Sequence, residues 1–363
     1  MNISSIIDHT VDVIANGENR RKFVVQRLLP LKYLDFSSSE LAEKKLVFPI
    51  SKWIPNGLVA GVDSGFVAKR LATIDLVLIR AMGVLFEYSD GKVVLAKYHP
   101  GYFNFPQPHL AGASLEDDEA EQSKSLMRLK EEVGVSKKII EEYSPKYLFI
   151  DGSIVPQYQD KPRKESELTD NYHGIISEFE SLYALAQKHN TTLIATVEDS
   201  RGSRFRSILQ DNVVEKMGSV RKEELDGIFD SSLLEYFLQV GERSCAFTYT
   251  KNIRQHPVLV DFNPQWAEGI YGLYVKPSAL DRPLRVEFIC HNKSELFEKA
   301  DEIASVATAL SSLHREYAYP SVLIEADFHA KLNNNEIDIV YNKIMDKLGA
   351  SVKMRMRRDN RPF

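Results

Sequence analysis

Apolar residues follow two periods between residues 57 and 199, and the way these periods alternate predicts the order of the elements. Short apolar runs bounded by Gly, Pro, Asn or Asp are typical of strands, whereas apolar positions three and four residues apart are typical of helices. The pattern predicts strands over 57–66, 72–88 and 92–103, a polar acidic loop over 109–125, helix 126–143, strand 146–155, helix 165–189 and strand 191–199.

The flanking segments predict additions to this central part. Residues 1–30 have the apolar spacing of one or two amphipathic helices, and residues 201–285 are less regular. A clear helix is expected over 294–314, with Ser294 as its N-cap, and a short apolar strand that leads into a helix is expected after Tyr319. We therefore divide the chain into an N-terminal helical segment with a connector (1–54), a main domain (55–345, with the insertion at about 201–285) and a basic tail (346–363).

The order of elements predicts the fold class. Three strands with hairpin connections are followed by two strand–helix–strand crossovers, and such crossovers join parallel strands with a right-handed connection. A mixed α/β sheet that begins antiparallel and continues parallel is the architecture of a ribonuclease-H-like core.

Composition narrows the class of protein but does not define it. The formal charge of -5 argues neither for nor against a nucleic-acid partner, because a basic face can lie on an acidic protein. Cys245 and Cys290 are the only cysteines, which excludes a cysteine zinc site and a disulfide framework. The absence of a long apolar run and of a signal-peptide core predicts a cytoplasmic protein without a membrane span.

Two acids follow two apolar strands and raise the question of chemistry. Asp63 ends the run in "LVAGVDSGFV", and Asp151 ends the run in "YLFIDGSIV". Two carboxylates at one apolar rim repel each other unless a cation neutralises them, and Mg²⁺ and Mn²⁺ prefer oxygen ligands. The pair therefore suggests metal-assisted phosphodiester hydrolysis, in which two ions can clamp the reacting oxygens. The alternative is that Asp-Gly and Asp-Ser-Gly form ordinary turns.

Further candidates lie on neighbouring elements. Glu131 and Glu132 lie in the predicted helix 126–143, and Glu132 borders its apolar stripe more closely; the alternative is a solvated helix face. Asp327 ends the run "YPSVLIEAD" and His329 lies two residues further on; the alternatives are a helix N-cap for Asp327 and a surface position for His329.

An ordered set of motifs between residues 55 and 345 resembles the NurA family of archaeal and bacterial nucleases that process DNA ends. The set comprises "GVDSGF", "LFIDGSIV", "TVEDSRGSRF", "GERSCAF", "YVKPS", "LRVEF" and "YPSVLIEAD", in the family's order. The resemblance implies a ribonuclease-H-like fold with helical additions that build a homodimer. It also implies Mn²⁺-dependent cleavage of single- and double-stranded DNA, with Mg²⁺ as the other suitable ion. The activities would be those of a 5′-to-3′ exonuclease and a single-strand endonuclease. The implied partner is HerA, a hexameric ATPase, and the implied process is DNA end resection in recombinational repair.

The resemblance also assigns roles to residues. It makes Asp63, Asp151 and either Glu132 or Glu131 metal ligands, and Tyr319 matches the family's active-site tyrosine. The family places a histidine where this chain has Asp327, so either Asp327 is the ligand, which we favour, or His329 serves.

Two loop arginines and three rival functions complete the sequence interpretation. Arg201 and Arg204 are candidate contacts to the DNA backbone, and the alternative is that they are surface arginines. Tyr319 or His329 is the candidate to orient the phosphate or the water.

The rival functions are another ribonuclease-H-like nuclease or resolvase, a catalytically weakened DNA clamp for an ATPase, and a sugar-kinase-like ATPase.

Overall fold

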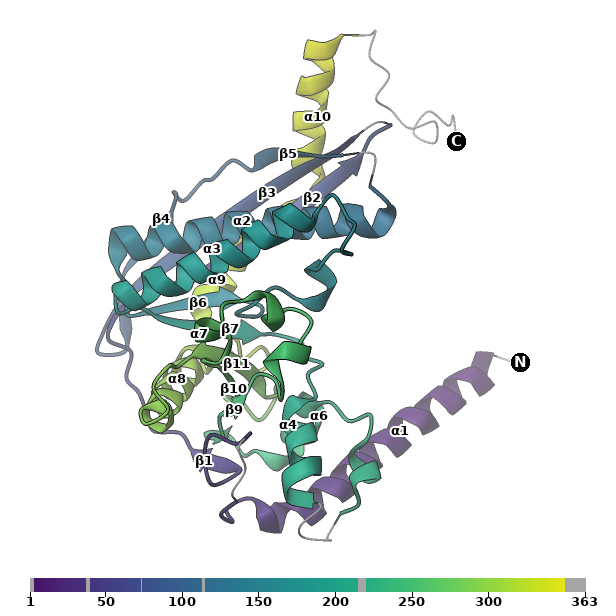
Figure 1. Cartoon of the computed structure of the whole chain (residues 1–363), viewed down its shortest axis with the longest axis vertical. Helices are drawn as coiled ribbons and strands as arrows, with labels where there is room; N and C mark the ends of the chain where they lie inside the picture. Colours follow the sequence, from purple (N-terminus) through teal and green to yellow (C-terminus); the bar gives the residue numbers. More distant parts are fainter. Residues whose placement is uncertain (1–2, 37–39, 73, 113–114, 215–219, 350–363) are drawn as a thin grey trace. The chain divides into compact units, whose positions relative to one another are not determined.

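The computed structural model describes residues 3–36, 40–72, 74–112, 115–214 and 220–349 (Figure 1). The chain divides into two compact units, and each is assembled from segments that are distant in the sequence. The first unit comprises Met1–Ile54, Thr196–Asn252 and Glu268–Pro320, and the second comprises Pro55–Ala195, Ile253–Ala267 and Ser321–Phe363. Most of the predicted basic tail, residues 350–363, lies outside the described residues.

The second unit is built on a mixed sheet whose strands run in the order β7, β6, β2, β3, β4. β2 pairs antiparallel with β3 and parallel with β6, while β4 and β5 pair with different parts of β3. Its strands are β2 (Gly57–Arg70), β3 (Ile74–Ser89), β4 (Lys92–His99), β5 (Gln107–Gly112), β6 (Tyr147–Asp151) and β7 (Thr192–Val197, whose last two residues begin the next segment of the first unit). Its helices are α2 (Asp117–Tyr143), α3 (Thr169–Lys188), α7 (Pro264–Ala267), α9 (Ser321–Ala330) and α10 (Asn334–Leu348), with short 3₁₀ turns at Tyr158–Asp160, Ile253–Gln255 and Leu259–Asp261.

Helices cover both faces of β2 and β3. α2 lies beside α3 (Figure 1) and packs on the face of Gly83, where an added Cβ would meet the side chain of Ile139. Gly83 pairs with Val62, so Gly61 faces the opposite side by the alternation of a strand. On that side α9 lies directly against β2.

The first unit combines short strands with helices from all three of its segments. Its strands are β1 (Val47–Pro49), β8 (Glu242–Ser244), β9 (Phe247–Thr248), β10 (Ile270–Val275) and β11 (Leu284–Ile289). Its helices are α1 (Ile3–Leu28), α4 (Arg204–Ile208), α6 (Asp230–Phe237) and α8 (Leu296–Ser311), with a π-helical turn at Leu209–Val214 and 3₁₀ turns at Leu29–Leu31 and Lys222–Leu225. The end of α1 packs into a core with α4, α6 and β9 through Val24, Val25 and Leu28.

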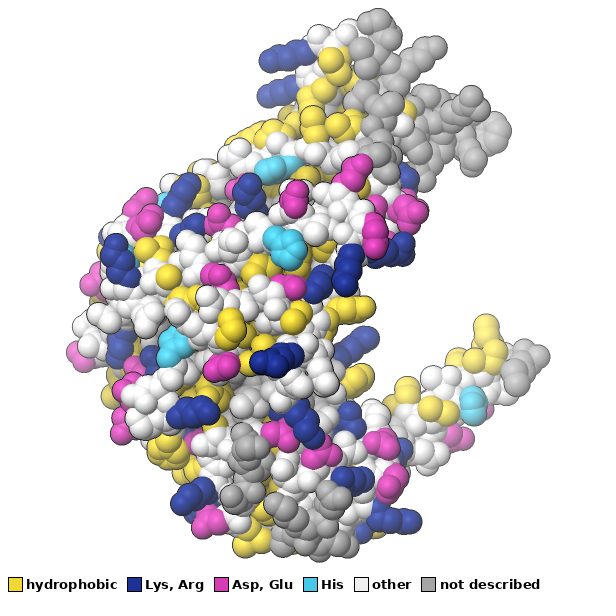
Figure 2. Space-filling model, viewed as in Figure 1, with side chains coloured by type: hydrophobic (Ala, Val, Ile, Leu, Met, Phe, Trp, Pro, Cys, Tyr) yellow, Lys and Arg dark blue, Asp and Glu magenta, His cyan; other side chains and the backbone are white. Residues whose placement is uncertain are grey.

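Most of α1 remains outside that core. Its apolar side chains from Ile3 to Ile14 are exposed, and Figure 2 shows hydrophobic side chains on the part of the helix near the N-terminus. Across the ranges that the structure describes, no helix is both long enough and apolar enough to cross a lipid bilayer.

The predicted fold class is confirmed, but three local predictions are wrong. The expected loop over 109–125 contains most of β5, which forms because the long edge of β3 pairs with it, and also the start of α2. α2 begins at Asp117 because its acidic first turn is favourable at a helix N-terminus, although the same acids are typical of a loop. The strand expected after Tyr319 is helix α9, and α8 begins after Glu295 rather than after Ser294.

Candidate active site

The parallel pairing of β2 with β6 brings the first two acids together, although Asp63 lies within β2, which continues to Arg70, and only Asp151 is at a strand end as the sequence predicted. β2 and β6 pair in register from Val59↔Tyr147 to Val62↔Ile150, so Asp63 and Asp151 are the next residues on the two strands. Neighbouring strands lie about 4.8 Å apart, which sets the spacing of these two backbone positions. β6 ends at Asp151, and Gly152 turns the chain with a positive φ of 94°. Asp63 is only 6% exposed, so its carboxylate lies inside this rim.

The helix α9 brings the third acid to the same place. Gly61 and Gly65 lie on the same face of β2 as Asp63, because each is two residues from Asp63 along the strand. A Cβ on Gly61 would lie 2.7 Å from backbone atoms of Val322, and one on Gly65 would lie 2.7 Å from the carbonyl oxygen of Ala330. The two glycines therefore let α9 cross β2 at backbone contact. The exposed carboxylate of Asp327 on this helix acts electrostatically on Asp63.

The helix α2 supplies the fourth acid and a cation. Glu132 is 2% exposed and accepts hydrogen bonds from Ser64 Oγ and, at 2.8 Å, from Arg128 Nη1. Arg128 Nη1 also donates to Ser64 Oγ at 3.1 Å. Arg128 and Glu132 are four residues apart, so they share one face of the helix. The sequence interpretation missed both Arg128 and Ser64, although this spacing and the position of Ser64 beside Asp63 were available signals.

The acids perturb one another's protonation. Burial raises the pKa of Asp63 to about 8, and repulsion by Asp151, Glu132 and Asp327 adds to the increase. Burial also raises the pKa of Glu132, although Arg128 and Ser64 oppose this by favouring its charged form. The pKa of Arg128 is raised, mainly by the charge of Glu132. The cluster therefore holds more negative charge than Arg128 neutralises, which is the condition under which a bound cation is stabilised.

The donor set fits a hard divalent cation. All four acids offer carboxylate oxygens, which are the ligands that Mn²⁺ and Mg²⁺ prefer, and Mg²⁺ usually takes only one or two carboxylates beside water and substrate oxygens. Among the residues described, no three acidic, histidine or cysteine side chains are already gathered tightly enough to form a complete metal cage. The four acids therefore form a cluster of potential ligands rather than a preformed cage.

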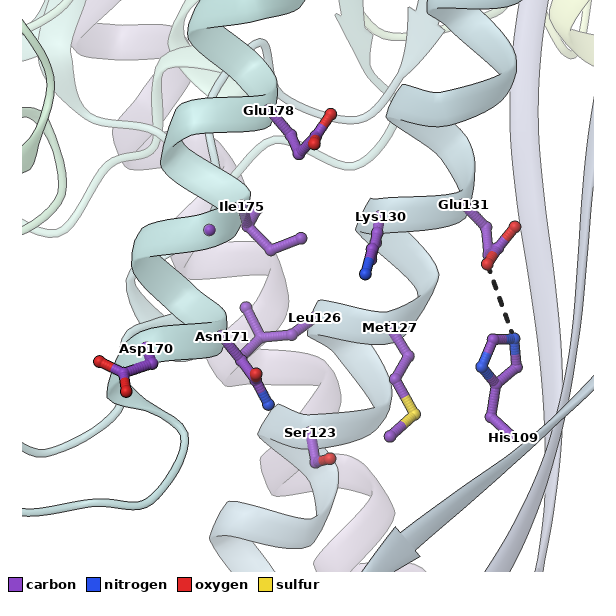
Figure 3. Close-up of a pocket in the computed structure, with 11 residues that line it drawn as sticks. His109, Ser123, Leu126, Met127, Lys130, Glu131, Asp170, Asn171, Ile175 and Glu178 are labelled. Carbon is purple, nitrogen blue, oxygen red and sulfur yellow. Dashed lines mark ion pairs between the residues drawn. The ribbon is translucent and has the colours of Figure 1, made fainter.

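The structure separates Glu131 from Glu132. Glu131 lines a groove of about 390 Å³ between α2 and α3, where it forms an ion pair with His109 of β5 at 3.7 Å (Figure 3). Glu132 is the member of this pair that contacts Ser64 beside Asp63.

The structure also separates Asp327 from His329. The ring of His329 packs between those of Tyr98 and Tyr102, with both centroid distances at 4.8 Å, and its Nε2 lies 3.3 Å from Glu325 Oε1. Asp327 is the residue of α9 whose charge acts on Asp63.

Tyr319, Arg201 and Arg204 belong to the first unit. The hydroxyl of Tyr319 donates to the carbonyl oxygen of Thr196 at 2.9 Å and accepts from the Thr196 hydroxyl at 3.1 Å. Arg201 is exposed beside a surface hollow that Arg282 also lines. Arg204 is enclosed, forming an ion pair with Glu40 at 2.8 Å and donating to Thr248, which gives its guanidinium a role inside this unit.

The mixed sheet, with four acids around the parallel pair β2 and β6, places this chain in the class of RNase-H-like α/β proteins. Solved structures agree with this class. The chain matches "Crystal structure of the NurA nuclease from Sulfolobus solfataricus" with a TM-score of 0.58 and 14% identity, over 97% of this chain and 99% of that one. It also matches "Crystal structure of NurA bound to dAMP and manganese" with a TM-score of 0.53 and 8% identity, over 99% of both chains.

The family model for the NurA domain matches residues 57–332. The chain therefore belongs to the NurA family, as its motifs predicted, and the family and these structures support a nuclease. A search of curated protein sequences finds no match.

Proposed function

We propose that this protein is a divalent-metal-dependent deoxyribonuclease. The observation that carries the proposal is the excess of negative charge around the buried Asp63 and Glu132 and the half-buried Asp151, with Asp327 beside it. Support for the metal comes from the similar structure of NurA bound to dAMP and manganese. Either Mn²⁺ or Mg²⁺ would supply Lewis acidity to the scissile phosphate and lower the pKa of the attacking water.

The residues of the chain would divide the work of holding this site. Asp63 would offer its carboxylate from within β2, Asp151 from the end of β6, and Glu132 from α2. Ser64 and Arg128 hold Glu132 by hydrogen bonds that fix its orientation. Asp327 would complete the set from α9, in place of the histidine that the family pattern has at this position. Glu131, Tyr319 and His329 are not assigned to metal binding in this proposal.

We further propose the finer features that the family implies. These are 5′-to-3′ exonuclease and single-strand endonuclease activity, action in DNA end resection, a homodimer, and a HerA-type hexameric ATPase as partner. Their support is membership of the NurA family. Arg201 remains a candidate contact for the DNA backbone because its side chain is exposed, whereas Arg204 is occupied within the first unit.

A cleavage assay on end-labelled single- and double-stranded DNA tests the proposal. We expect cleavage with Mn²⁺ or Mg²⁺, none with EDTA, and a rate reduced by roughly a hundredfold or more in Asp63→Asn, because a charged group that acts on the transition state is lost. Glu132→Gln should reduce the rate comparably, and Asp327→Asn should reduce it as well.

Glu131→Gln is the matched control, because it makes the same change one residue away on the same helix. We expect its rate to stay within about twofold of wild type, since Glu131 does not contact the acid cluster and its half-buried ion pair with His109 lies in the groove between α2 and α3. Wild-type protein without cleavage under every metal condition, with or without a HerA-type ATPase, would contradict the nuclease proposal and leave a DNA-binding scaffold. Equal losses in the two glutamine variants would contradict the assignment of Glu132.

A further inference from the structure

The loop that follows β6 is fixed to the two helices α2 and α3. We call residues 152–161 the β6 loop, because they continue directly from the end of that strand. Near the start of the loop, the hydroxyl of Tyr183 on α3 donates a hydrogen bond to the carbonyl oxygen of Ile154. Near its end, Gln122 Nε2 on α2 donates to the carbonyl oxygen of Gln159 at 2.9 Å. The position of the loop is therefore set by both helices.

Asp160 places a buried carboxylate in this loop. Its relative exposure is 7%, and its Oδ1 accepts a hydrogen bond from Ser125 Oγ of α2 at 2.6 Å. Its Oδ2 accepts from the backbone N–H of Gln157 at 2.7 Å, within the loop itself. A buried carboxylate is stable only where hydrogen bonds replace its lost hydration, and here both oxygens are used in this way. Asp160 thus joins the folded form of the loop to α2.

Ser125 belongs to a polar stripe on α2 that reaches the acid cluster. Ser125, Arg128 and Glu132 follow one another at intervals of three and four residues, so they lie along one face of the helix. The charge of Glu132 does most to raise the pKa of Arg128, and the charge of Asp160 also contributes. Asp160 therefore lies within electrostatic reach of the same guanidinium that holds Glu132.

The β6 loop and the polar stripe carry two of the proposed ligands. Asp151 directly precedes the loop, and Glu132 lies about two helical turns beyond Ser125 on α2. The hydrogen bond between Asp160 and Ser125 joins these two parts of the chain. Residues that orient metal ligands from behind commonly change metal affinity or activity by about ten- to a hundredfold when they are replaced.

We infer that Asp160 is a positioning residue of the acid cluster. By holding the β6 loop on α2 at Ser125, it sets the separation of Asp151 from Glu132 and thereby the affinity of the site for a divalent cation. This role rests on the proposed metal-dependent function. Asp160 is not itself a ligand, since its two oxygens accept from Ser125 and Gln157.

Binding of Mn²⁺ to the full chain without DNA tests this role apart from cleavage. Isothermal titration calorimetry gives the dissociation constant of wild type, Asp160→Ala and Ser125→Ala. We expect both variants to bind Mn²⁺ about tenfold more weakly, because either change releases the β6 loop from α2. Combining them should weaken binding no further than Asp160→Ala alone, since both remove the same hydrogen bond. Asp160→Asn keeps an oxygen for Ser125 and should lose less than Asp160→Ala.

Thr191→Val is the matched control. The Thr191 hydroxyl is as buried as Asp160 and donates to the carbonyl oxygen of Pro145 at 2.8 Å, just before β6 and at the opposite end of that strand from Asp151. We expect the control to unfold at a lower temperature by circular dichroism but to bind Mn²⁺ within about twofold of wild type, because the two sites are independent. Ser125→Ala should stay folded, since alanine is the most favourable residue in a helix.

The Mn²⁺ dependence of DNA cleavage supplies a second measurement. In Asp160→Ala the Mn²⁺ concentration for half-maximal rate should rise about tenfold. The rate at saturating Mn²⁺ should return to within about threefold of wild type, because excess metal stabilises the arrangement that binds it. A rate that is reduced equally at every Mn²⁺ concentration would overturn the positioning role and indicate only a structural one.

The outcomes separate the positioning role from the nuclease proposal. Unchanged Mn²⁺ affinity in Asp160→Ala and Ser125→Ala, or an equal loss in Thr191→Val, would overturn the role even if wild type cleaves DNA. Wild-type protein that binds no Mn²⁺ would contradict the proposed function, and the positioning role with it. If wild type binds Mn²⁺ but cleaves no DNA, a loss of affinity confined to the Asp160 and Ser125 variants would still support the role.

Discussion

In the first unit, the fully buried guanidinium of Arg243 meets Glu43 through hydrogen bonds of 2.7 and 2.8 Å, and its Nε lies 3.3 Å from Asp301. In the second unit, Asp63, Glu132 and Asp151 act on one another around Arg128. Both arrangements bury charge, but the first sets one guanidinium against one buried and one partly exposed carboxylate, whereas the second sets one guanidinium against three carboxylates. Buried charges that are paired mainly affect the stability of the folded state. A cluster with an excess of carboxylates is instead a candidate catalytic site.

Removing the guanidinium of Arg243 from the first unit should have the largest effect on stability. Arg243→Met leaves the carboxylate of Glu43, which is 2% exposed, without its partner. We expect the free energy of unfolding to fall by about 3–5 kcal/mol, as for other broken buried pairs, in urea denaturation followed by circular dichroism.

Arg27→Met is the matched control for this prediction. Arg27 forms a surface ion pair with Glu224 at 2.6 Å, and the loss of such a pair changes the free energy of unfolding by at most about 1 kcal/mol. Adding Glu43→Leu to Arg243→Met should recover part of the loss, because the uncompensated charge is then absent. Equal losses in the Arg243 and Arg27 variants would show that the buried pair contributes no more than a surface pair.

The close packing of α9 on β2 should have the next largest effect, because α9 carries Asp327 of the acid cluster. Gly61→Ala would place a methyl group 2.7 Å from backbone atoms of Val322, and a backbone cannot rotate away as a side chain can. We expect unfolding free energy to fall by roughly 2–3 kcal/mol, as for overpacked cores, with DNA cleavage also reduced because Asp327 moves with the helix.

The control for the glycine is Gly174→Ala on α3. An added Cβ there has no atom within 4 Å, so the change should be neutral or should stabilise the helix by up to about 1 kcal/mol. If Gly61→Ala behaved like Gly174→Ala, α9 would not depend on backbone contact with β2.

The acids of β2 and β6 and the fold class could be predicted because their signals are local. Asp63 and Asp151 each end an apolar run, and the order of hairpins and crossovers is visible along the chain. Other features depend on contacts that local patterns do not contain. Val322 and Leu323 begin a run that is equally typical of a buried strand, but the structure places this segment in helix α9, which packs on Gly61.

The partners of the acids were harder to predict for the same reason. Ser64 and Arg128 matter because tertiary structure brings β2 and α2 together around Glu132. The two units could not be predicted by cutting the sequence into consecutive domains, since each is composed of three separate segments. Residues that act through neighbours in space leave little signal in their own sequence context.

The pH dependence of the unfolding free energy reports the contribution of one acid of the second unit, Asp63. In metal-free protein the pKa of Asp63 is raised from 3.8 to about 8, whereas in the unfolded chain the group titrates near its ordinary value. Below pH 4 both states hold the proton, so Asp63 contributes no pH dependence. Between these two values the unfolded chain releases the proton and the folded chain keeps it, so stability falls as the pH rises, and the loss levels off above pH 8.

Asp63→Asn removes this titration and should therefore remove the loss of stability that Asp63 causes between pH 4 and pH 8. In EDTA, its stability advantage over wild type should grow by roughly 2 kcal/mol between pH 6 and pH 8, because a one-proton difference changes the unfolding free energy by about 1.4 kcal/mol per pH unit. The measurement is urea denaturation at a series of pH values. Mn²⁺ should stabilise wild type more at pH 8 than at pH 6, since fewer protons must leave the carboxylates, and should stabilise the variant less at either pH. Parallel pH profiles for the two proteins would mean that Asp63 is already paired in the folded chain, and the contrast between the two units would then disappear.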